Sequence, residues 1–290
     1  LDLEEPDRIP LLEMGFSKVM MEGILGRTPF ASNTFLCLEM ASKGKADVVN
    51  EGMAKDLIDR NRKVGLDFIS AGGGYTNDVK ATVQVDDETY VINGRKVRRS
   101  QPEAEGETFW DMDKFTVNWD KERALAHIEE LNADREEIMA DPSKATTVLD
   151  MVVKEVGDEY FVYGGADGSW GPIVSNNPLL VKVLMWMYTE PKLVKDLIEA
   201  YTRKAIETGK TQIDAGARGI LMCVDYGYSK GPWMLPRQFR TFVQPALKAQ
   251  CDAWQKRGAF ALLHCDGNID AILTDVVEGG IDAYQCIDVQ

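Results

Sequence analysis

The feature that most constrains the fold is a regular alternation of short apolar runs with longer amphipathic stretches, which begins near residue 160. The apolar runs are almost continuous, as expected of parallel strands that are buried on both faces. Strands and helices that alternate in this way form right-handed βαβ units. We expect strands at 160–165, 218–225, 260–267 (with its exit loop) and 281–288, and helices at 178–188, 191–216, 236–258 (kinked near Pro245) and 268–280.

This pattern permits two α/β architectures, a closed barrel and an open doubly wound sheet. No GxGxxG or GxxxxGK[ST] motif follows a strand, which weakens the nucleotide-binding open sheet. Three glycines at 72–74 do follow a predicted strand, but no helix with the right glycine spacing comes after them. We interpret them as an active-site loop or a tight turn.

The first half of the chain has a different pattern. We expect helices at 13–25, 46–64, 120–132 and 134–140 and a buried strand at 66–70. Residues 79–119 instead alternate between apolar and polar side chains, with Asn93-Gly94 as a hairpin turn. We therefore predict an antiparallel, β-rich insertion in this region.

Composition excludes several classes of protein. The 33 Lys and Arg against 47 Asp and Glu give a net charge of -14 without any basic patch, so a nucleic-acid partner is not expected. No apolar run approaches the ~20 residues that cross a bilayer, and the N-terminus has no signal-peptide pattern. The five cysteines fit no disulfide framework. We expect a cytoplasmic protein with no membrane partner.

Polar side chains gather where three predicted strands end, and parallel α/β barrels place their catalytic groups at such ends. The three groups are Cys223, Asp225 and Tyr226; His264, Cys265, Asp266 and Asn268; and Gln285, Cys286 and Asp288. We expect Asp225, Tyr226 and His264 to be catalytic. We expect the substrate to contact Tyr226, Asn268 and Trp170, an aromatic residue of the segment GGADGSWGP.

A catalytic zinc needs three protein ligands and one open position. His264 and Asp266 lie two residues apart in an extended segment and so point to the same side, whereas Cys265 faces the core. A residue of a neighbouring strand end must complete the site; Cys223 is our choice, with Asp225 and Cys286 as alternatives. His127, the other histidine, is surrounded by glutamates and is expected on a solvated face.

Four segments resemble the uroporphyrinogen decarboxylase superfamily. They are EEPDRIP at 4–10, WGPIVSNNPLL with TEPKLVKDLIEAYT at 170–202, VDYGYSKGPWMLPRQFRTFVQPALKAQ at 224–250, and LLHCDGNIDAILTDVVEGGIDAYQCID at 262–288. The resemblance implies one (β/α)8 barrel over residues 1–290, with 79–119 inserted. Family members continue beyond the strand at 281–288, so the resemblance implies either a chain truncated at Gln290 or a missing part that is supplied in another way. The chain lacks the "R-Q-A-G-R-Y" substrate loop of true uroporphyrinogen decarboxylases, which disfavours a porphyrinogen substrate.

The other branch that the chain resembles is that of corrinoid-dependent methyltransferases. Its thiol-methylating members hold zinc with "H-x-C" and a later cysteine; here His264 matches the histidine and Asp266 replaces the first cysteine. A site richer in oxygen suits an ether or hydroxyl substrate better than a thiol. The resemblance thus implies zinc, a small methyl donor such as a methoxylated aromatic, and a corrinoid carried by a partner protein.

Our leading hypothesis is therefore the methyltransferase component of a cobamide-dependent system, active in O-demethylation. The alternatives are a metal-independent decarboxylase or lyase that uses Asp225 and His264 as acid and base, and a binding barrel without chemistry. A homodimer is compatible with the sequence, which leaves the oligomeric state open. A barrel fold alone does not choose between these functions.

Overall fold

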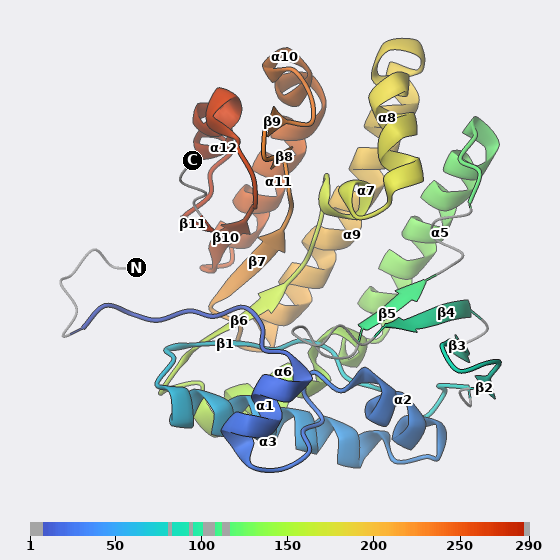
Figure 1. Cartoon of the computed structure of the whole chain (residues 1–290). Coiled ribbons are helices and arrows are strands. Elements are labelled where there is room, and N and C mark those ends of the chain that lie inside the picture. Colours follow the sequence, from blue (N-terminus) through green and yellow to red (C-terminus); the bar gives the residue numbers. More distant parts are fainter. Residues whose placement is uncertain (1–7, 81–82, 93–94, 101–107, 112–116, 287–290) are drawn as a thin grey trace. The chain divides into compact units, whose positions relative to one another are not determined.

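The structure, a computed structural model, describes residues 8–80, 83–92, 95–100, 108–111 and 117–286 (Figure 1). The Asn93-Gly94 turn, the first four residues of the EEPDRIP motif and Asp288 lie outside these ranges. The chain divides into two compact units: unit 1 comprises residues 1–112 and 147–163, and unit 2 comprises residues 113–146 and 164–290. Each unit is described by itself.

Unit 1 joins helices to one parallel strand pair and one antiparallel sheet. Its elements are α1 (Lys18–Leu25), α2 (Thr34–Ser42), α3 (Ala46–Val64), β1 (Phe68–Ser70), β2 (Val83–Gln84), β3 (Thr89–Ile92), β4 (Arg95–Ser100), β5 (Thr108–Asp111), most of α6 (Ser143–Val156) and the start of β6 (Phe161–Gly165). Strand β1 pairs in parallel with β6. Strands β2 to β5 pair antiparallel in chain order, which confirms the predicted β-rich insertion.

Two helix starts in unit 1 depart from the prediction. Helix α1 begins at Lys18 rather than residue 13, because the Ser17 side chain caps it by accepting a hydrogen bond from Met20 N at 3.3 Å. Helix α2 was not predicted, and its Asn33 cap accepts from Leu36 N in the same way. Helix α3 matches its predicted range and ends at Gly65, whose φ of 79° suits glycine.

Unit 2 contains the alternation of strands and helices. Its elements are α5 (Lys121–Ala140), α7 (Gly171–Val174), α8 (Asn177–Thr189), α9 (Pro191–Asp214), β7 (Gly219–Cys223), β8 (Gly227–Tyr228), β9 (Gly231–Pro232), α10 (Pro236–Gln238), the π-helix η1 (Phe239–Val243), α11 (Gln244–Gln255), β10 (Phe260–His264), the 3₁₀ helix η2 (Asp270–Ile272), α12 (Leu273–Glu278) and β11 (Ala283–Gln285). The residues predicted as two helices at 120–140 form one helix, since nothing near residue 133 interrupts the hydrogen bonding.

The helix predicted to be interrupted or kinked near Pro245 is interrupted there by a π-helical turn. Proline has no backbone N–H and its ring crowds the preceding turn, so a regular α-helix cannot run through it. The helix accommodates Pro245 with the π-turn of η1, which ends at Val243 just before α11 starts.

Strands β7, β10 and β11 of unit 2 are parallel and place their carboxyl ends along one edge, whereas the short strands β8 and β9 pair antiparallel in a separate hairpin. Strand β10 pairs with β7 on one side and with β11 on the other, so that His264 lies in register with both Cys223 and Gln285. Ala166, just after β6, donates its N–H to Leu221 O of β7 at 3.1 Å. The loops that leave β6, β7, β10 and β11 therefore start near one another.

Helices cover the strands of unit 2 (Figure 1). Helix α9 packs on β7 and on α5, and α11 packs on β10 and on α9. The inner face of α9 buries Leu193, Val194 and Leu197, each worth roughly 1.5–3 kcal/mol. Gly209 lets Trp254 of α11 approach closely, because a Cβ there would lie 2.3 Å from the indole Nε1. No helix in the described part of the chain combines the length and the apolar character that a membrane span requires.

Candidate active site

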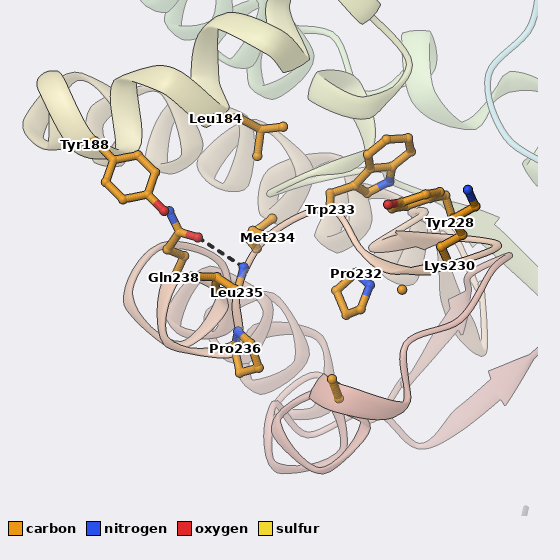
Figure 2. Close-up of a pocket in the computed structure, with 12 residues that line it drawn as sticks. Leu184, Tyr188, Tyr228, Lys230, Pro232, Trp233, Met234, Leu235, Pro236 and Gln238 are labelled. Atoms are coloured by element: carbon orange, nitrogen blue, oxygen red, sulfur yellow. Dashed lines mark hydrogen bonds between the residues drawn. The ribbon is translucent and has the colours of Figure 1, made fainter.

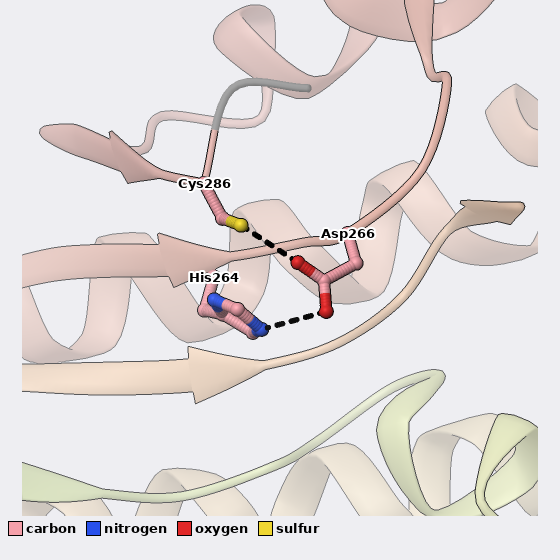
Figure 3. Close-up of side chains that lie close together, drawn as sticks. All are labelled: His264, Asp266 and Cys286. Carbon is pink, nitrogen blue, oxygen red and sulfur yellow. Dashed lines mark hydrogen bonds and ion pairs between the residues drawn. The ribbon is translucent and has the colours of Figure 1, made fainter. Parts of the chain in front are cut away.

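His264 is the last residue of β10, and its imidazole is held by the next strand. Its Nδ1 hydrogen-bonds to the amide oxygen of Gln285 on β11. Because an amide oxygen only accepts, Nδ1 is the donor in this contact, and Nε2 is the ring nitrogen that remains for a metal. That nitrogen lies 3.6 Å from Asp266 Oδ2 (Figure 3). The sheet register thus orients His264 toward the loop that follows it.

Cys286 joins the same cluster from the end of β11. Its backbone has a φ of 73°, which turns the chain sharply after Gln285. The thiol donates to Asp266 Oδ1 over 2.7 Å. One ligand atom from each of His264, Asp266 and Cys286 lies within 4.8 Å of the other two. Figure 3 shows the Asp266 carboxylate between the ring and the thiol.

The chemistry of these three side chains fits zinc. Imidazole nitrogen, carboxylate oxygen and thiolate sulfur are its usual protein ligands, and ligand atoms around a tetrahedral zinc lie roughly 3.5 Å apart. The atoms here need small side-chain rotations to reach that spacing. Gln285 supplies the outer hydrogen bond that typically fixes a metal-binding histidine. The side chain of Asp266 is 61% exposed, so one side of the cluster is open to a reactant.

Further carboxylates lie next to this cluster. Asp225, in the loop after β7, accepts a hydrogen bond from Asp266 N at 2.9 Å and so fixes the loop after β10. Asp167, in the loop after β6, accepts from Cys223 N at 2.8 Å. Burial raises the pKa of Asp167, an effect that the Cys223 N–H and the nearby His264 oppose and Asp225 reinforces. Asp167 was not predicted, although it too is a polar residue just after an apolar strand.

Cys223, the predicted third metal ligand, is outside the cluster. It lies beside His264 in the sheet register, but its backbone N–H is bound by Asp167. Loss of water contacts and the neighbouring Asp167 and Asp225 raise the pKa of its thiol to about 11, which keeps the thiol protonated at neutral pH. The structure instead places Cys286 beside His264 and Asp266.

Of the three predicted substrate-binding residues, two are fully buried and one is partly exposed. Trp170 and Tyr226 are fully buried, and Tyr226 packs edge-to-face on Phe239, so neither offers a surface to a ligand in this structure. Asn268 is partly exposed and accepts from Asp270 N through its Oδ1 at 3.1 Å, which starts η2. Cys265 is fully buried, as predicted for a core thiol.

The prediction of a solvated His127 was wrong. Its side chain is only 21% exposed and lies between α5 and α9. Nδ1 is 2.8 Å from Glu130 Oε2, and Nε2 is 2.8 Å from the Tyr201 hydroxyl. Sequence spacing shows the surrounding glutamates but not the tyrosine on another helix.

Comparison with known proteins shows the family and the fold of the chain. The uroporphyrinogen decarboxylase (URO-D) family model matches residues 117–288, more than half of the chain. The chain belongs to this family. None of the curated proteins matches it. A solved structure that is similar to this member of the uroporphyrinogen decarboxylase family is a methyltransferase from Methanosarcina mazei, with 16% identity, a TM-score of 0.58 and coverage of 97% of this chain and 72% of that chain.

At 16% identity, this likeness shows the fold alone. The fold is the (β/α)8 barrel type predicted from the sequence, and the described residues include five of its parallel strands, β1, β6, β7, β10 and β11. The residues that match the family model include His264, Asp266 and Cys286, so the candidate site lies within the matched region.

Proposed function

We propose that this member of the uroporphyrinogen decarboxylase family is the methyltransferase component of a cobamide-dependent system. It would move a methyl group from a small methoxylated aromatic substrate to a corrinoid carried by a partner protein. The observation that carries the proposal is the group of His264, Asp266 and Cys286 at the strand ends. The methyltransferase fold likeness supports it without identifying the donor or the acceptor.

His264 Nε2, the Asp266 carboxylate and the Cys286 thiolate would hold zinc, with Cys286 in the place that we first gave to Cys223. Bound zinc would act as a Lewis acid on the ether oxygen of the substrate. Gln285 keeps the proton on His264 Nδ1, and Asp225 holds the backbone of Asp266 in place. These two residues preorganise the site before any reactant arrives.

Methyl transfer from an aryl ether breaks the oxygen–methyl bond and leaves an oxygen that must take a proton. Asp167 is suited to hold that proton, because burial raises its pKa despite the opposing hydrogen bond from Cys223 N. Asp225 is the alternative proton donor, as predicted from the sequence. The buried Tyr226 is no longer part of the proposal.

Metal content of purified variants tests the ligand set. We expect about one zinc per chain in the wild type by elemental analysis, as in a three-ligand catalytic site. Cys286→Ala should lose it, whereas the matched variant Cys223→Ala should retain it. The reverse result would restore Cys223 as the third ligand. A wild-type protein that binds no zinc on titration would sink the metal mechanism.

A second measurement tests the reaction. The zinc-loaded protein, mixed with cob(I)alamin and 4-methoxybenzoate, should release 4-hydroxybenzoate in amounts equal to the methylated cobalamin formed. Release of carbon dioxide by a metal-free protein would instead support the metal-independent decarboxylase that remains the second candidate. The family name is the observation that favours this alternative.

A further inference from the structure

A pocket of about 450 Å³ lies in unit 2 (Figure 2). Its walls come from the end of α8, the β8–β9 hairpin and the segment that enters α10. Pockets that bind small molecules commonly have volumes of roughly 300–1,000 Å³. The pocket is therefore large enough for a ring-sized ligand.

The lining of the pocket is mostly aromatic and aliphatic. Tyr228 and Trp233 stack with ring centroids 4.9 Å apart and 27° between their planes. Tyr188 of α8 stands across from them, 63% exposed, and Leu184 and Met234 fill the space between (Figure 2). Exposed aromatic faces favour the binding of a planar ring, because the bound ring removes their apolar surface from contact with water.

Lys230 supplies a positive charge to the lining of the pocket. It is the single charged residue among those that line the pocket, and the described part of the chain places no carboxylate in an ion pair with it. Trp233 Nε1 is also buried there without a hydrogen-bond acceptor among the described residues. In a chain of net charge -14, a lone lysine beside an apolar wall selects an anion.

The hairpin of the pocket packs directly on the loop of the candidate active site. Asn268 N donates to Tyr228 O at 3.0 Å. A Cβ at Gly267 would lie 2.8 Å from Tyr228 Cα, and one at Gly227 would lie 2.5 Å from Asn268 O, so both positions require glycine for the contact. Ala271 of the same segment lines the pocket, five residues after Asp266.

We propose that the pocket formed by Tyr188, Tyr228, Lys230 and Trp233 binds a planar aromatic carboxylate. The ring lies against the stacked Tyr228–Trp233 pair and the carboxylate meets Lys230. This site is separate from the proposed zinc ligands, since none of His264, Asp266 and Cys286 lines the pocket. The binding needs neither a metal nor a corrinoid, so it stands or fails independently of methyl transfer.

Isothermal titration of the metal-free full chain with 4-methoxybenzoate tests the proposal, because without zinc the ether oxygen has no Lewis acid to bind beside His264. We expect saturable 1:1 binding with a dissociation constant on the order of 1 mM or below. The neutral 4-methoxybenzyl alcohol should bind about 10-fold more weakly, since it lacks the charge that meets Lys230. Equal affinity for the acid and the alcohol would contradict the role of Lys230.

Four variants complete the test. Lys230→Met should weaken the carboxylate about 10-fold and leave the alcohol unchanged, while Lys192→Met, the same change on exposed α9, should affect neither. Trp233→Leu should weaken both probes, with its fold checked by circular dichroism. His264→Ala should bind as the wild type does. Loss of carboxylate binding in His264→Ala with normal binding in Lys230→Met would place the probe at the zinc ligands and overturn the proposal.

Discussion

The two histidines of the chain lie in the same unit, but they differ in how many ring nitrogens are hydrogen-bonded to neighbouring side chains. Both nitrogens of His127 meet partners within hydrogen-bond distance, Glu130 and Tyr201, between two helices. His264 has only Nδ1 bonded in this way, and its Nε2 faces a carboxylate that a thiol also contacts. A histidine is available for chemistry when one nitrogen is fixed and the other remains open beside further ligands.

The largest expected effect is on bound zinc when the imidazole of His264 or of His127 is removed. His264→Ala should reduce bound zinc from about one per chain to less than about a tenth, because it takes away one of three ligands. His127→Ala should leave the zinc content unchanged. Elemental analysis of both purified variants measures the difference, and an equal loss from both would break the comparison.

Gln285 tests the same contrast, because its side-chain oxygen hydrogen-bonds to His264 Nδ1. Gln285→Leu should lower zinc affinity by about 10–100-fold, since the imidazole loses the bond that fixes its tautomer and orientation. Gln285→Glu keeps an acceptor oxygen and should restore most of that affinity. Competition with a zinc-chelating dye gives both values. A Gln285→Leu protein with wild-type affinity would show that His264 needs no outer partner.

The two histidine variants should affect the free energy of unfolding in the opposite order to their effects on zinc content. His127→Ala should lower the free energy of unfolding by about 1–3 kcal/mol, because it leaves the buried Tyr201 hydroxyl without its partner. His264→Ala, at the carboxyl end of β10, should lower the free energy of unfolding by about 1 kcal/mol in the metal-free protein. Urea unfolding followed by circular dichroism compares them. A more destabilising His264→Ala would reverse the roles that we assign.

The smallest effect concerns pH. Hydrogen bonds from Arg123 and then His127 lower the pKa of Glu130 to about 2, from an ordinary value of 4.5. Its contribution to stability is therefore complete above pH 4.5 and is lost as the pH falls toward 2. The side chain is 53% exposed, so the contribution should stay below about 1 kcal/mol.

Unfolding of Glu130→Gln, measured from pH 7 to pH 2.5, checks this expectation. The variant should be slightly less stable than the wild type at neutral pH, and the two should converge in acid. A difference that grows as the pH falls would mean that the Arg123–Glu130–His127 network is not the origin of the shift.

The sequence by itself determined the alternation of strands and helices after residue 160, the β-rich insertion and the family, but not helices α2 and α6. Those features follow from local patterns: apolar runs, helical spacing and the position of Pro245. It also identified His264 and Asp266 as neighbours, because their spacing of two in an extended segment puts them on one side.

Only the tertiary structure decided which other residues join them. Cys286 replaced Cys223 because a positive φ after β11 turns its thiol toward Asp266, a bend that no spacing rule in the sequence specifies. Trp170 and Tyr226 became core residues, and His127 gained Tyr201, through packing between segments far apart in the chain. Contacts of this kind depend on strand register and helix packing, which local sequence constrains only weakly.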